Sequence, residues 1–354
     1  MDISPSYRLL SGEQALKLSS VSRTVTHLSQ RDPDFIESYL AYASTAKAVA
    51  IEFDWTHEEM MVPNVTDRDT LVSLAKMTAD AYVDTPESND WMDIGYPYND
   101  TDKFGWDSNG LRGHIFADES NSTVIIATKG TSAAVFHSDG DTVSSDKVND
   151  NVLFSCCCAR ISYLWRTVCD CYTKANTCSQ SCLENELYSE DYYYRALLDI
   201  YRNVSSLYPN ANIWSTGHSL GGAMASLLGR TYGLPTVAFE SPGEQLAAKR
   251  LHLPFPPIPE NETTLWHIGN TADPIYMGVC NGPTSVCWLG GYAMETACHS
   301  GLECIYDTVN DLKWHISISN HRIRPIIDMM LLNDTVPTCQ VRQGCQDCYD
   351  WTFE

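Results

Sequence analysis

The chain has 354 residues, a formal net charge of −22 and 14 cysteines. This length suffices for one large domain whose core forms without disulfide support. The acidic balance and the lack of a basic patch exclude nucleic acid as the expected partner. At neutral pH the same charge repels an anionic membrane, and protonation of carboxylates in an acidic lumen weakens that repulsion.

The cysteine content and the glycosylation signals both favour the secretory pathway. Six N-x-[ST] sequons are present, at Asn64, Asn99, Asn121, Asn203, Asn261 and Asn333. The first residues, Met1 to Pro5, have neither the basic flank nor the apolar core of a signal peptide. The sequence contains no run of about 18 apolar residues, so no transmembrane helix is predicted. We therefore expect that an N-terminal targeting segment has been removed from this form of the protein.

The N-terminal part of the chain has a helical pattern. In Ser11–Phe53, apolar side chains recur at near-helical spacing, at Ile36, Tyr39, Leu40, Ala43, Ala46 and Ala50. We expect residues 1–68 to form a helical segment that packs on the main body. Residues 69–334 are expected to form the main domain, beginning with a helix over Asp69–Val83. Residues 335–354 form a cysteine-rich, loop-like tail of the same domain.

From Gly113 onward the pattern alternates between strands and helices. Gly113–Asp118 and Thr123–Thr128 are short, apolar and joined by polar residues, which predicts a hairpin. Ser138–Asn151 is rich in Asp, Ser and Gly and predicts a mobile loop. Further strands are expected at Asn212–Thr216, Thr236–Phe239 and Leu265–Ile268, and helices at Leu187–Tyr208, Ser219–Tyr232 and within Leu302–Leu332. This alternation predicts an α/β fold, with a mostly parallel sheet covered by helices on both faces.

The pentapeptide Gly217-His218-Ser219-Leu220-Gly221 has the form G-x-S-x-G and lies between a predicted strand and a predicted helix. In this context the motif makes a nucleophile elbow, a tight turn that lifts the serine hydroxyl out of the sheet. The glycines leave room for neighbouring chain, and the following helix directs free N–H groups towards developing negative charge. A Gly-rich turn with an ordinary N-cap serine is the alternative. The motif makes Ser219 the candidate nucleophile.

A serine nucleophile needs a base and an acid that orients the base, in the chain order Ser, acid, His. Asp273 follows the predicted strand that ends at Ile268, and the carboxyl ends of parallel strands are where α/β sheets build their sites. Pro274 fixes the turn that presents Asp273. Asp307 and Asp311 lie in a polar stretch and are expected to be solvated. Asp273 is therefore the candidate acid.

Three histidines lie downstream of the candidate acid, at His299, His315 and His321. The first would be restricted by a small disulfide loop between Cys298 and Cys304. The second alternates with isoleucines and is expected to be structural. His321 lies in a polar loop just before an apolar stretch, and it is therefore the candidate base. Ordinary hydrogen-bonding roles are expected for the two remaining candidates, His218, which would support the elbow, and His267.

Attack on a carbonyl group places negative charge on its oxygen, and two N–H donors would stabilise that charge. One donor is the N–H of Leu220, the residue after the candidate nucleophile. The other is expected from the loop after an early strand. There, Lys129-Gly130-Thr131 offers the N–H of Thr131 and its hydroxyl. A simple β-turn at Gly130 is the alternative.

These motifs resemble the class 3 lipases, a family of the α/β-hydrolases. The resemblance is carried by Lys129–Ser132, by Trp214–Ala223, and by Phe239–Gly243 with Asn270–Ile275, which are similar to the acid-bearing region of the family. It implies an α/β-hydrolase fold. The many additional cysteines depart from the family pattern and predict disulfide-rich loops. Lys129 stands where the family usually has arginine.

Two narrower segments, Phe154–Arg160 with its three cysteines and His321–Arg324, resemble the fungal vacuolar phospholipases that break down autophagic bodies. That resemblance implies a serine phospholipase, without cofactor or metal, that hydrolyses acyl esters of vesicle membranes in the vacuole lumen. It also implies a glycoprotein made with an N-terminal membrane anchor. A lid is then expected in Ala133–Phe154 or in Ile161–Trp165.

The cysteines allow two interpretations. The pairs Cys178-x-x-x-Cys182 and Cys345-x-x-Cys348 have spacings found in zinc sites. Together with the sequons, the cysteines favour disulfides instead. Local pairs are expected at Cys280–Cys287 and Cys298–Cys304, and the remaining connectivity does not follow from the sequence.

Two other functions fit the same residues. The chain could be an esterase for soluble esters, or a catalytically silent hydrolase-fold glycoprotein that binds membranes or another protein. Silent members of such folds usually lose a residue of the triad. Here candidates for Ser, Asp and His all occur in the required order, which favours an enzyme.

Overall fold

A computed structural model of the protein describes residues 18–45, 52–95, 97–132, 141–160, 165–259, 262–333 and 335–354. Within these residues the largest sheet has seven strands in the order β11-β10-β9-β8-β5-β4-β3. The strands span Tyr98–Phe104 (β3), Gly113–Asp118 (β4), Thr123–Thr128 (β5), Asn212–His218 (β8), Thr236–Phe239 (β9), Leu265–Asn270 (β10) and Leu302–Tyr306 (β11).

The sheet is mostly parallel. Strands β5, β8, β9, β10 and β11 run parallel to one another, whereas β4 pairs antiparallel with β5, and β3 antiparallel with β4, at one edge. The predicted hairpin is present, since β4 and β5 pair antiparallel with Ile115 opposite Ile126. The carboxyl ends of the parallel strands therefore meet at one edge of the sheet, where α/β folds build their sites.

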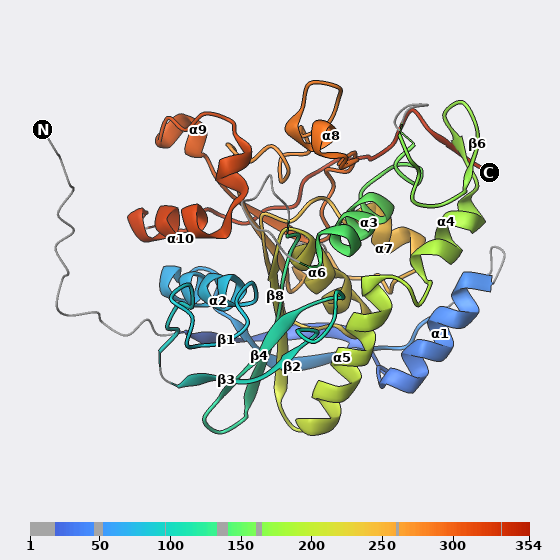
Figure 1. Ribbon diagram of the computed structural model, residues 1–354. Helices are drawn as coiled ribbons and strands as arrows, with labels where there is room; N and C mark the ends of the chain where they lie inside the picture. Colours follow the sequence, from blue (N-terminus) through green and yellow to red (C-terminus); the bar gives the residue numbers. More distant parts are fainter. Residues whose placement is uncertain are drawn as a thin grey trace, which may run out of the picture.

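Helices cover both faces of this sheet (Figure 1). Phe116 and Ile125 point to one side and pack with α2 (Arg68–Asp80) and α10 (Ile323–Leu332). Ile115 and Ile126 point to the other side and pack with α3 (Val143–Leu153), α5 (Tyr193–Leu207) and α6 (Leu220–Tyr232). Successive residues of each strand thus enter the cores on opposite faces of the sheet, so both sets must be apolar, as in a strand buried on both faces. The architecture is the predicted α/β-hydrolase fold.

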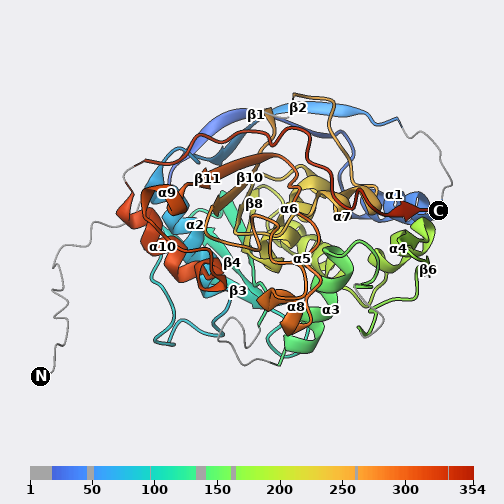
Figure 2. The same cartoon turned by 90° about the horizontal axis from the view of Figure 1, so that it is seen from above.

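The N-terminal region differs from its prediction. The helix α1 (Pro33–Thr45) is present. The strands β1 (Ser20–Leu28), before it in the chain, and β2 (Trp55–Pro63), after it, pair with each other as an antiparallel ribbon. The all-helical interpretation of Ser11–Phe53 is wrong over β1, which is rich in Val and Thr, residues that favour strands. The ribbon runs along one side of the molecule (Figure 2), and the Met61 carbonyl accepts a hydrogen bond from Trp214 Nε1 at 2.9 Å. Residues 11–17, Ala46 and Ala50 lie outside the described residues.

The predicted loop over Ser138–Asn151 is also wrong from Val143 onward, because α3 (Val143–Leu153) occupies it. Four of its polar side chains are buried and hydrogen-bonded rather than solvated, namely Asp146, Asn149, Asp150 and Asn151. Asp146 accepts from Tyr193 Oη at 2.7 Å, and Asn149 accepts from the Tyr193 N–H at 2.8 Å. Tertiary partners thus stabilise a helix whose composition is typical of a loop. Residues 133–140, part of the first lid candidate, and 161–164, most of the second, lie outside the described residues.

The remaining elements refine the predicted boundaries. The predicted helix Leu187–Tyr208 begins later, as α5, and follows a separate helix α4 (Gln180–Leu187). Leu302–Leu332 holds the strand β11 as well as the helices α9 (Thr308–Asp311), η3 (Ile318–His321) and α10. Short elements complete the description, namely β6 (Tyr172–Lys174), β7 (Thr177–Cys178), α7 (Gln245–Arg250), α8 (Val286–Gly290) and β12 (Thr352–Phe353).

All 14 cysteines lie in the described residues, and all are paired in disulfides. The pair Cys280–Cys287 is confirmed, whereas the predicted pair Cys298–Cys304 is wrong. Three bonds instead tie the tail to the body, namely Cys298–Cys345, Cys304–Cys339 and Cys156–Cys348. The other pairs are Cys157–Cys178, Cys158–Cys169 and Cys171–Cys182.

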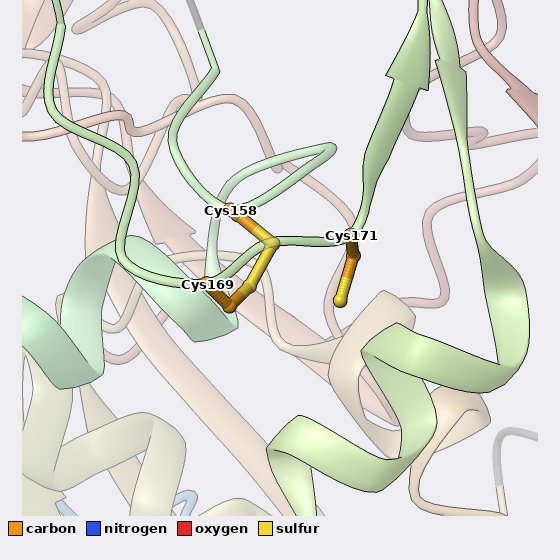
Figure 3. Close-up of side chains that lie close together, drawn as sticks. All are labelled: Cys158, Cys169 and Cys171. Atoms are coloured by element: carbon orange, nitrogen blue, oxygen red, sulfur yellow. A yellow bond between two sulfur atoms is a disulfide. The ribbon is translucent and has the colours of Figure 1, made fainter.

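These bonds decide between zinc and disulfides. Figure 3 shows three sulfurs gathered at one place, with Cys158 and Cys169 joined to each other beside Cys171. The thiolates that zinc requires are absent there, because Cys171 is bonded to Cys182. The disulfide interpretation holds for the described residues.

Two further expectations concern membrane-spanning helices and the exposure of the glycosylation sites. The described residues include no helix with the length and apolar character needed to cross a bilayer. Five of the predicted glycosylation sites are at least partly exposed to solvent, namely Asn64, Asn99, Asn121, Asn203 and Asn333. The sixth, Asn261, lies outside the described residues.

Candidate active site

Ser219 occupies a sharp turn between β8 and α6, as the G-x-S-x-G motif predicts. Its backbone is held at φ 58° and ψ −129°, a strained conformation for a residue with a side chain. The turn also depends on its glycines. A Cβ on Gly217 would lie 2.2 Å from the Gly221 carbonyl oxygen, and one on Gly221 would lie 2.2 Å from that of Thr128. The motif therefore forms a nucleophile elbow.

The three predicted residues of the triad are brought together at the elbow. His321 Nε2 lies 2.8 Å from Ser219 Oγ, and His321 Nδ1 lies 2.7 Å from Asp273 Oδ2. All three side chains are buried, with 4% or less of each residue exposed. Since a carboxylate only accepts hydrogen bonds, Nδ1 carries the proton and Nε2 accepts the hydrogen of the serine hydroxyl. In this arrangement a serine hydroxyl passes its proton to an imidazole as it attacks.

The elements around the triad fix its geometry. Asp273 follows β10 and accepts the Ile275 N–H at 2.8 Å through its other oxygen. Asn270, at the end of β10, accepts the Ala272 N–H at 2.9 Å and donates to the Asn320 carbonyl at 3.2 Å. One amide thus joins the loop that carries the acid to the short helix η3 that carries the base.

His218 has the supporting role expected of it. Its Nε2 donates to the backbone carbonyl of His321, and its Nδ1 accepts the Tyr82 hydroxyl hydrogen at 2.7 Å. Burial lowers the pKa of His218 to about 3, so that this ring stays neutral. The elbow and the base are therefore locked together through a neutral imidazole.

Glu240 is a residue of this site that sequence reasoning missed. It follows β9, is fully buried at φ 45°, and accepts the Asn270 side-chain amide at 2.8 Å. Burial and the neighbouring Asp273 charge raise the pKa of Glu240 well above its usual range, so its carboxyl is neutral and donates to Asp273. Burial alone would raise the pKa of Asp273, but His321 and the hydrogen bonds outweigh burial and lower it. The available signal was a lone carboxylate directly after a buried parallel strand.

The two predicted oxyanion donors lie beside the candidate nucleophile. Leu220 begins α6, and Thr131 lines a small pocket together with Ser219. A Cβ on Gly130 would lie 3.0 Å from the Ser219 Cβ, so the Thr131 loop passes directly by the serine. The Thr131 hydroxyl bonds Asp150 Oδ2 at 2.6 Å.

Lys129, in the position where the resembling family usually has arginine, ties this loop to α3. Its ammonium group donates to the Gly130 carbonyl at 2.8 Å, to Thr142 Oγ1 at 3.0 Å and to Asp146 at 3.2 Å. The Lys129 side chain therefore fixes the loop by bonding both the backbone of the loop and residues at the start of α3.

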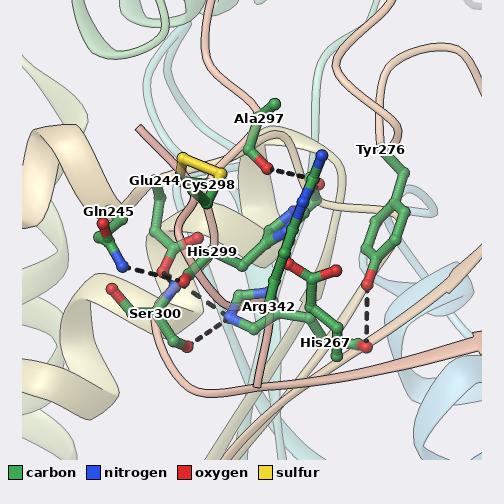
Figure 4. A network of polar contacts seen from close by, with 12 residues as sticks. Glu244, Gln245, His267, Tyr276, Ala297, Cys298, His299, Ser300 and Arg342 are labelled. Atoms are coloured by element: carbon green, nitrogen blue, oxygen red, sulfur yellow. Dashed lines mark hydrogen bonds and ion pairs between the residues drawn. A yellow bond between two sulfur atoms is a disulfide. The ribbon is translucent and has the colours of Figure 1, made fainter. Parts of the chain in front are cut away.

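The other candidate acids and bases are not at the site. Asp307 caps α9, and Asp311 and His315 are exposed. His299 is buried in a separate network with both ring nitrogens engaged, Nδ1 by Glu303 at 3.1 Å and Nε2 by the Ser241 carbonyl at 2.8 Å (Figure 4). His267 lies in the same network, where its Nε2 donates to the Ser300 carbonyl at 2.9 Å. This network instead contacts the tail, since Arg342 donates to the Ala297 carbonyl at 3.0 Å.

Buried carboxyls give the fold a pH dependence. Burial raises the pKa of Asp80 to about 7 and that of Asp150 to about 8. Such a group binds its proton more tightly in the folded than in the unfolded chain, so stability is lost as pH rises towards the folded pKa. His218 and His267, with pKa values lowered by burial to about 3 and about 4, oppose this loss only while the unfolded histidines titrate, below about pH 6.5.

We therefore expect the free energy of unfolding to fall between about pH 6.5 and about pH 8, by roughly 2 kcal/mol from Asp150 alone. Thermal unfolding at fixed ionic strength measures this change. Asp150→Asn should flatten the curve, whereas Asp141→Asn, at an exposed neighbouring carboxylate, should leave it steep. A melting temperature that rises across this range would contradict the assignment.

The segment that carries the elbow matches a known lipase family. Residues 163–233 match the family described as Lipase (class 3). They include α5, β8, Ser219 and α6. The α/β-hydrolase fold, the elbow and this match define the chain as one with a class 3 lipase segment.

Two fungal relatives are similar over nearly the whole chain. It is 55% identical to the lipase named ATG15 of Pichia angusta over 348 residues, which cover 96% of this chain and 65% of that protein. It is 58% identical to the lipase of the same name from Yarrowia lipolytica over 346 residues, which cover 96% of this chain and 62% of that protein. The chain is a homologue of these fungal ATG15 lipases and spans less than two thirds of the length of these curated relatives.

Among solved structures, the nonglycosylated LIP2 lipase of Yarrowia lipolytica aligns with 95% of this chain and 92% of its own, at 16% identity and a TM-score of 0.37. The fold of the present chain is defined by its own strand order and elbow.

Proposed function

We propose that the chain is a serine lipase that hydrolyses the acyl esters of membrane phospholipids. The observation that carries the proposal is the buried hydrogen-bonded series from Ser219 through His321 to Asp273 at a nucleophile elbow. The similarity to ATG15 lipases and the class 3 lipase segment support the reaction class. The catalytic roles of the three residues are part of the proposal.

In the proposed reaction, Ser219 Oγ attacks the ester carbonyl carbon while His321 Nε2 takes the hydroxyl proton. The carbonyl oxygen becomes negative and accepts hydrogen bonds from the N–H groups of Leu220 and Thr131. The intermediate collapses as the C–O bond to the glycerol oxygen breaks, and His321 returns its proton to that oxygen. The lysolipid leaves, and water activated by His321 then hydrolyses the acyl-enzyme to free fatty acid and Ser219.

The surroundings of Ser219 support a fatty acyl group. A narrow pocket beside the serine is lined mainly by apolar side chains, among them Ile275, Val286, Met294 and Ile318. Such a lining removes acyl carbons from water. We place the acyl carbons next to the ester against these side chains.

Location in an acidic vacuole lumen is part of the proposal. Disulfide pairing of all the cysteines supports an oxidising secretory route, and the exposed sequons support glycosylation on that route. The expected fall in stability above about pH 6.5 is consistent with an acidic compartment. An anchor preceding the described residues is expected from the resemblance to vacuolar phospholipases.

The pH dependence of the oxyanion loop provides a test of its role. The Thr131 hydroxyl donates to Asp150 Oδ2 at 2.6 Å. Burial raises the pKa of Asp150 to about 8, so below that pH the carboxyl is neutral and holds the hydroxyl hydrogen only weakly, which lets the hydroxyl turn towards the oxyanion. The ionised Asp150 carboxylate accepts the same hydrogen more strongly and withdraws that donor from the oxyanion. Loss of one oxyanion donor costs about 100-fold in kcat. We therefore expect kcat to fall as pH rises through about 8.

Asp150→Asn should abolish this fall, because the amide oxygen accepts the Thr131 hydrogen without carrying a charge at any pH. Asp141→Asn is the matched control and should keep the wild-type profile. Measuring kcat on a soluble ester from pH 6 to pH 10 checks this expectation. An Asp150→Asn profile identical to wild type would refute the role given to Asp150.

The lipase proposal itself is tested with vesicles that mix several phospholipids. Mass analysis of the products should detect equimolar free fatty acid and lysophospholipid at acidic pH, and neither with protein that has been inactivated by an organophosphonate ester. Turnover of a monomeric ester should also rise sharply above its solubility limit. Hydrolysis of soluble esters with no attack on vesicles would identify an esterase instead, and no hydrolysis of either would refute the proposal.

A further inference from the structure

A second, larger cavity opens beside Ser219. It has a volume of about 310 Å³ and is lined by the end of α2, by the elbow, and by the start of α10. Both Ser219 and His321 contribute to its wall. This cavity is distinct from the narrow apolar pocket, so two different spaces meet at the candidate nucleophile.

The lining of the larger cavity is cationic. It includes Arg322 and Arg324 but a single carboxylate, Asp90, among the described residues that line it. Arg324 is half-exposed and pairs with Asp90 at 3.1 Å. Two guanidinium groups against one carboxylate give this lining an excess of one positive charge, in a protein whose net charge is −22.

Arg322 has hydrogen-bonding capacity that the described residues do not use. Its Nε is buried and has no hydrogen-bond partner among them. A buried N–H without an acceptor is destabilising. A guanidinium group is especially suited to oxygens of phosphate, which it binds through two parallel N–H groups.

We propose that Arg322 and Arg324 form a subsite for the phosphodiester of a glycerophospholipid whose acyl ester lies on Ser219. This inference rests on the proposed lipase function. Arg322 directly follows His321 in the chain, so the subsite adjoins the reacting atoms. In a glycerophospholipid the phosphate and the ester are likewise attached to one glycerol unit. The ester then lies between the two spaces, with the first acyl carbons against the apolar pocket and the phosphate in the arginine-lined cavity.

The readout is a ratio of kcat/KM values for two substrates with the same acyl chains, dioleoylphosphatidylcholine and dioleoylglycerol, in the same mixed micelles. Any disturbance of His321 lowers both rates alike and cancels in the ratio. We expect Arg322→Gln to lower the phospholipid-to-diacylglycerol ratio about tenfold. Arg324→Gln should lower the ratio less, because Arg324 already pairs with Asp90. Arg202→Gln on α5 is the matched control and should keep the ratio.

A binding measurement separates failure of the subsite from failure of the lipase proposal. Calorimetry with sn-glycerol 3-phosphate on the folded Ser219→Ala protein should detect binding that Arg322→Gln removes, with glycerol as the silent comparison. Binding without any lipid hydrolysis would support the subsite and overturn the lipase function. Hydrolysis with an unchanged ratio would overturn the subsite. Inorganic phosphate that binds as tightly as glycerophosphate, with an unchanged ratio, would indicate a site for free phosphate and overturn the lipid assignment.

Discussion

Ser219→Ala should lower kcat for ester hydrolysis by about a million-fold, the loss typical of removing a triad nucleophile. Alanine offers no oxygen to attack the carbonyl carbon, while the elbow backbone and the Leu220 N–H stay in place. The change removes one oxygen from a buried site, so the fold is expected to survive. Fatty acid release from vesicles, with circular dichroism to verify folding, measures the effect.

Ser38→Ala, on the exposed face of α1, is the matched control and should keep full activity. Ser219→Ala is expected to keep only the residual rate that substrate binding and the oxyanion donors give over the uncatalysed reaction. Activity within tenfold of wild type in the folded variant would show that another group attacks the ester.

Asp273→Asn has the second largest expected effect, a loss in kcat of about ten-thousand-fold. The carboxylate accepts the His321 Nδ1 hydrogen at 2.7 Å and so leaves Nε2 free to accept the serine proton. An amide in its place donates to Nδ1 and forces the proton onto Nε2, where it blocks transfer from Ser219. The variant keeps the shape of the side chain, so KM should change little.

Asp311→Asn controls for this substitution, since Asp311 is exposed and was an alternative acid on sequence grounds. The pH profile of kcat adds a second readout. In the wild type, the neutral Glu240 carboxyl donates a hydrogen bond to the charged Asp273, and in Asp273→Asn that charged acceptor is absent. Equal losses from the Asp273 and Asp311 substitutions would contradict the assigned acid.

The parts of the fold set by local sequence could be predicted. The elbow follows from a strand, two glycines and a helix, and the structure contains it at Ser219 with the predicted flanks. The β4–β5 hairpin follows from two apolar runs with a polar turn. Asp273 was predictable from its place after β10, and His321 from its polar loop, since both arguments use chain order and the sheet edge.

The parts set by distant partners could not be predicted. α3 has the composition of a loop and is helical because Asp146 and Asn149 find partners on α5. Cys298 pairs with Cys345 rather than with the nearby Cys304, since the tail passes over the body. Glu240 is neutral only because burial places it against Asp273, and no sequence pattern reports such a contact.

The central claim is that Ser219 Oγ is the atom that attacks the acyl carbonyl. Reaction of the folded protein with a p-nitrophenyl alkylphosphonate, followed by peptide mass mapping, tests it most directly. We predict one phosphonate on Ser219, formed with release of one nitrophenolate, and far slower labelling in His321→Asn. An unlabelled folded protein, or an adduct on a different serine with Ser219 unmodified, would contradict the claim.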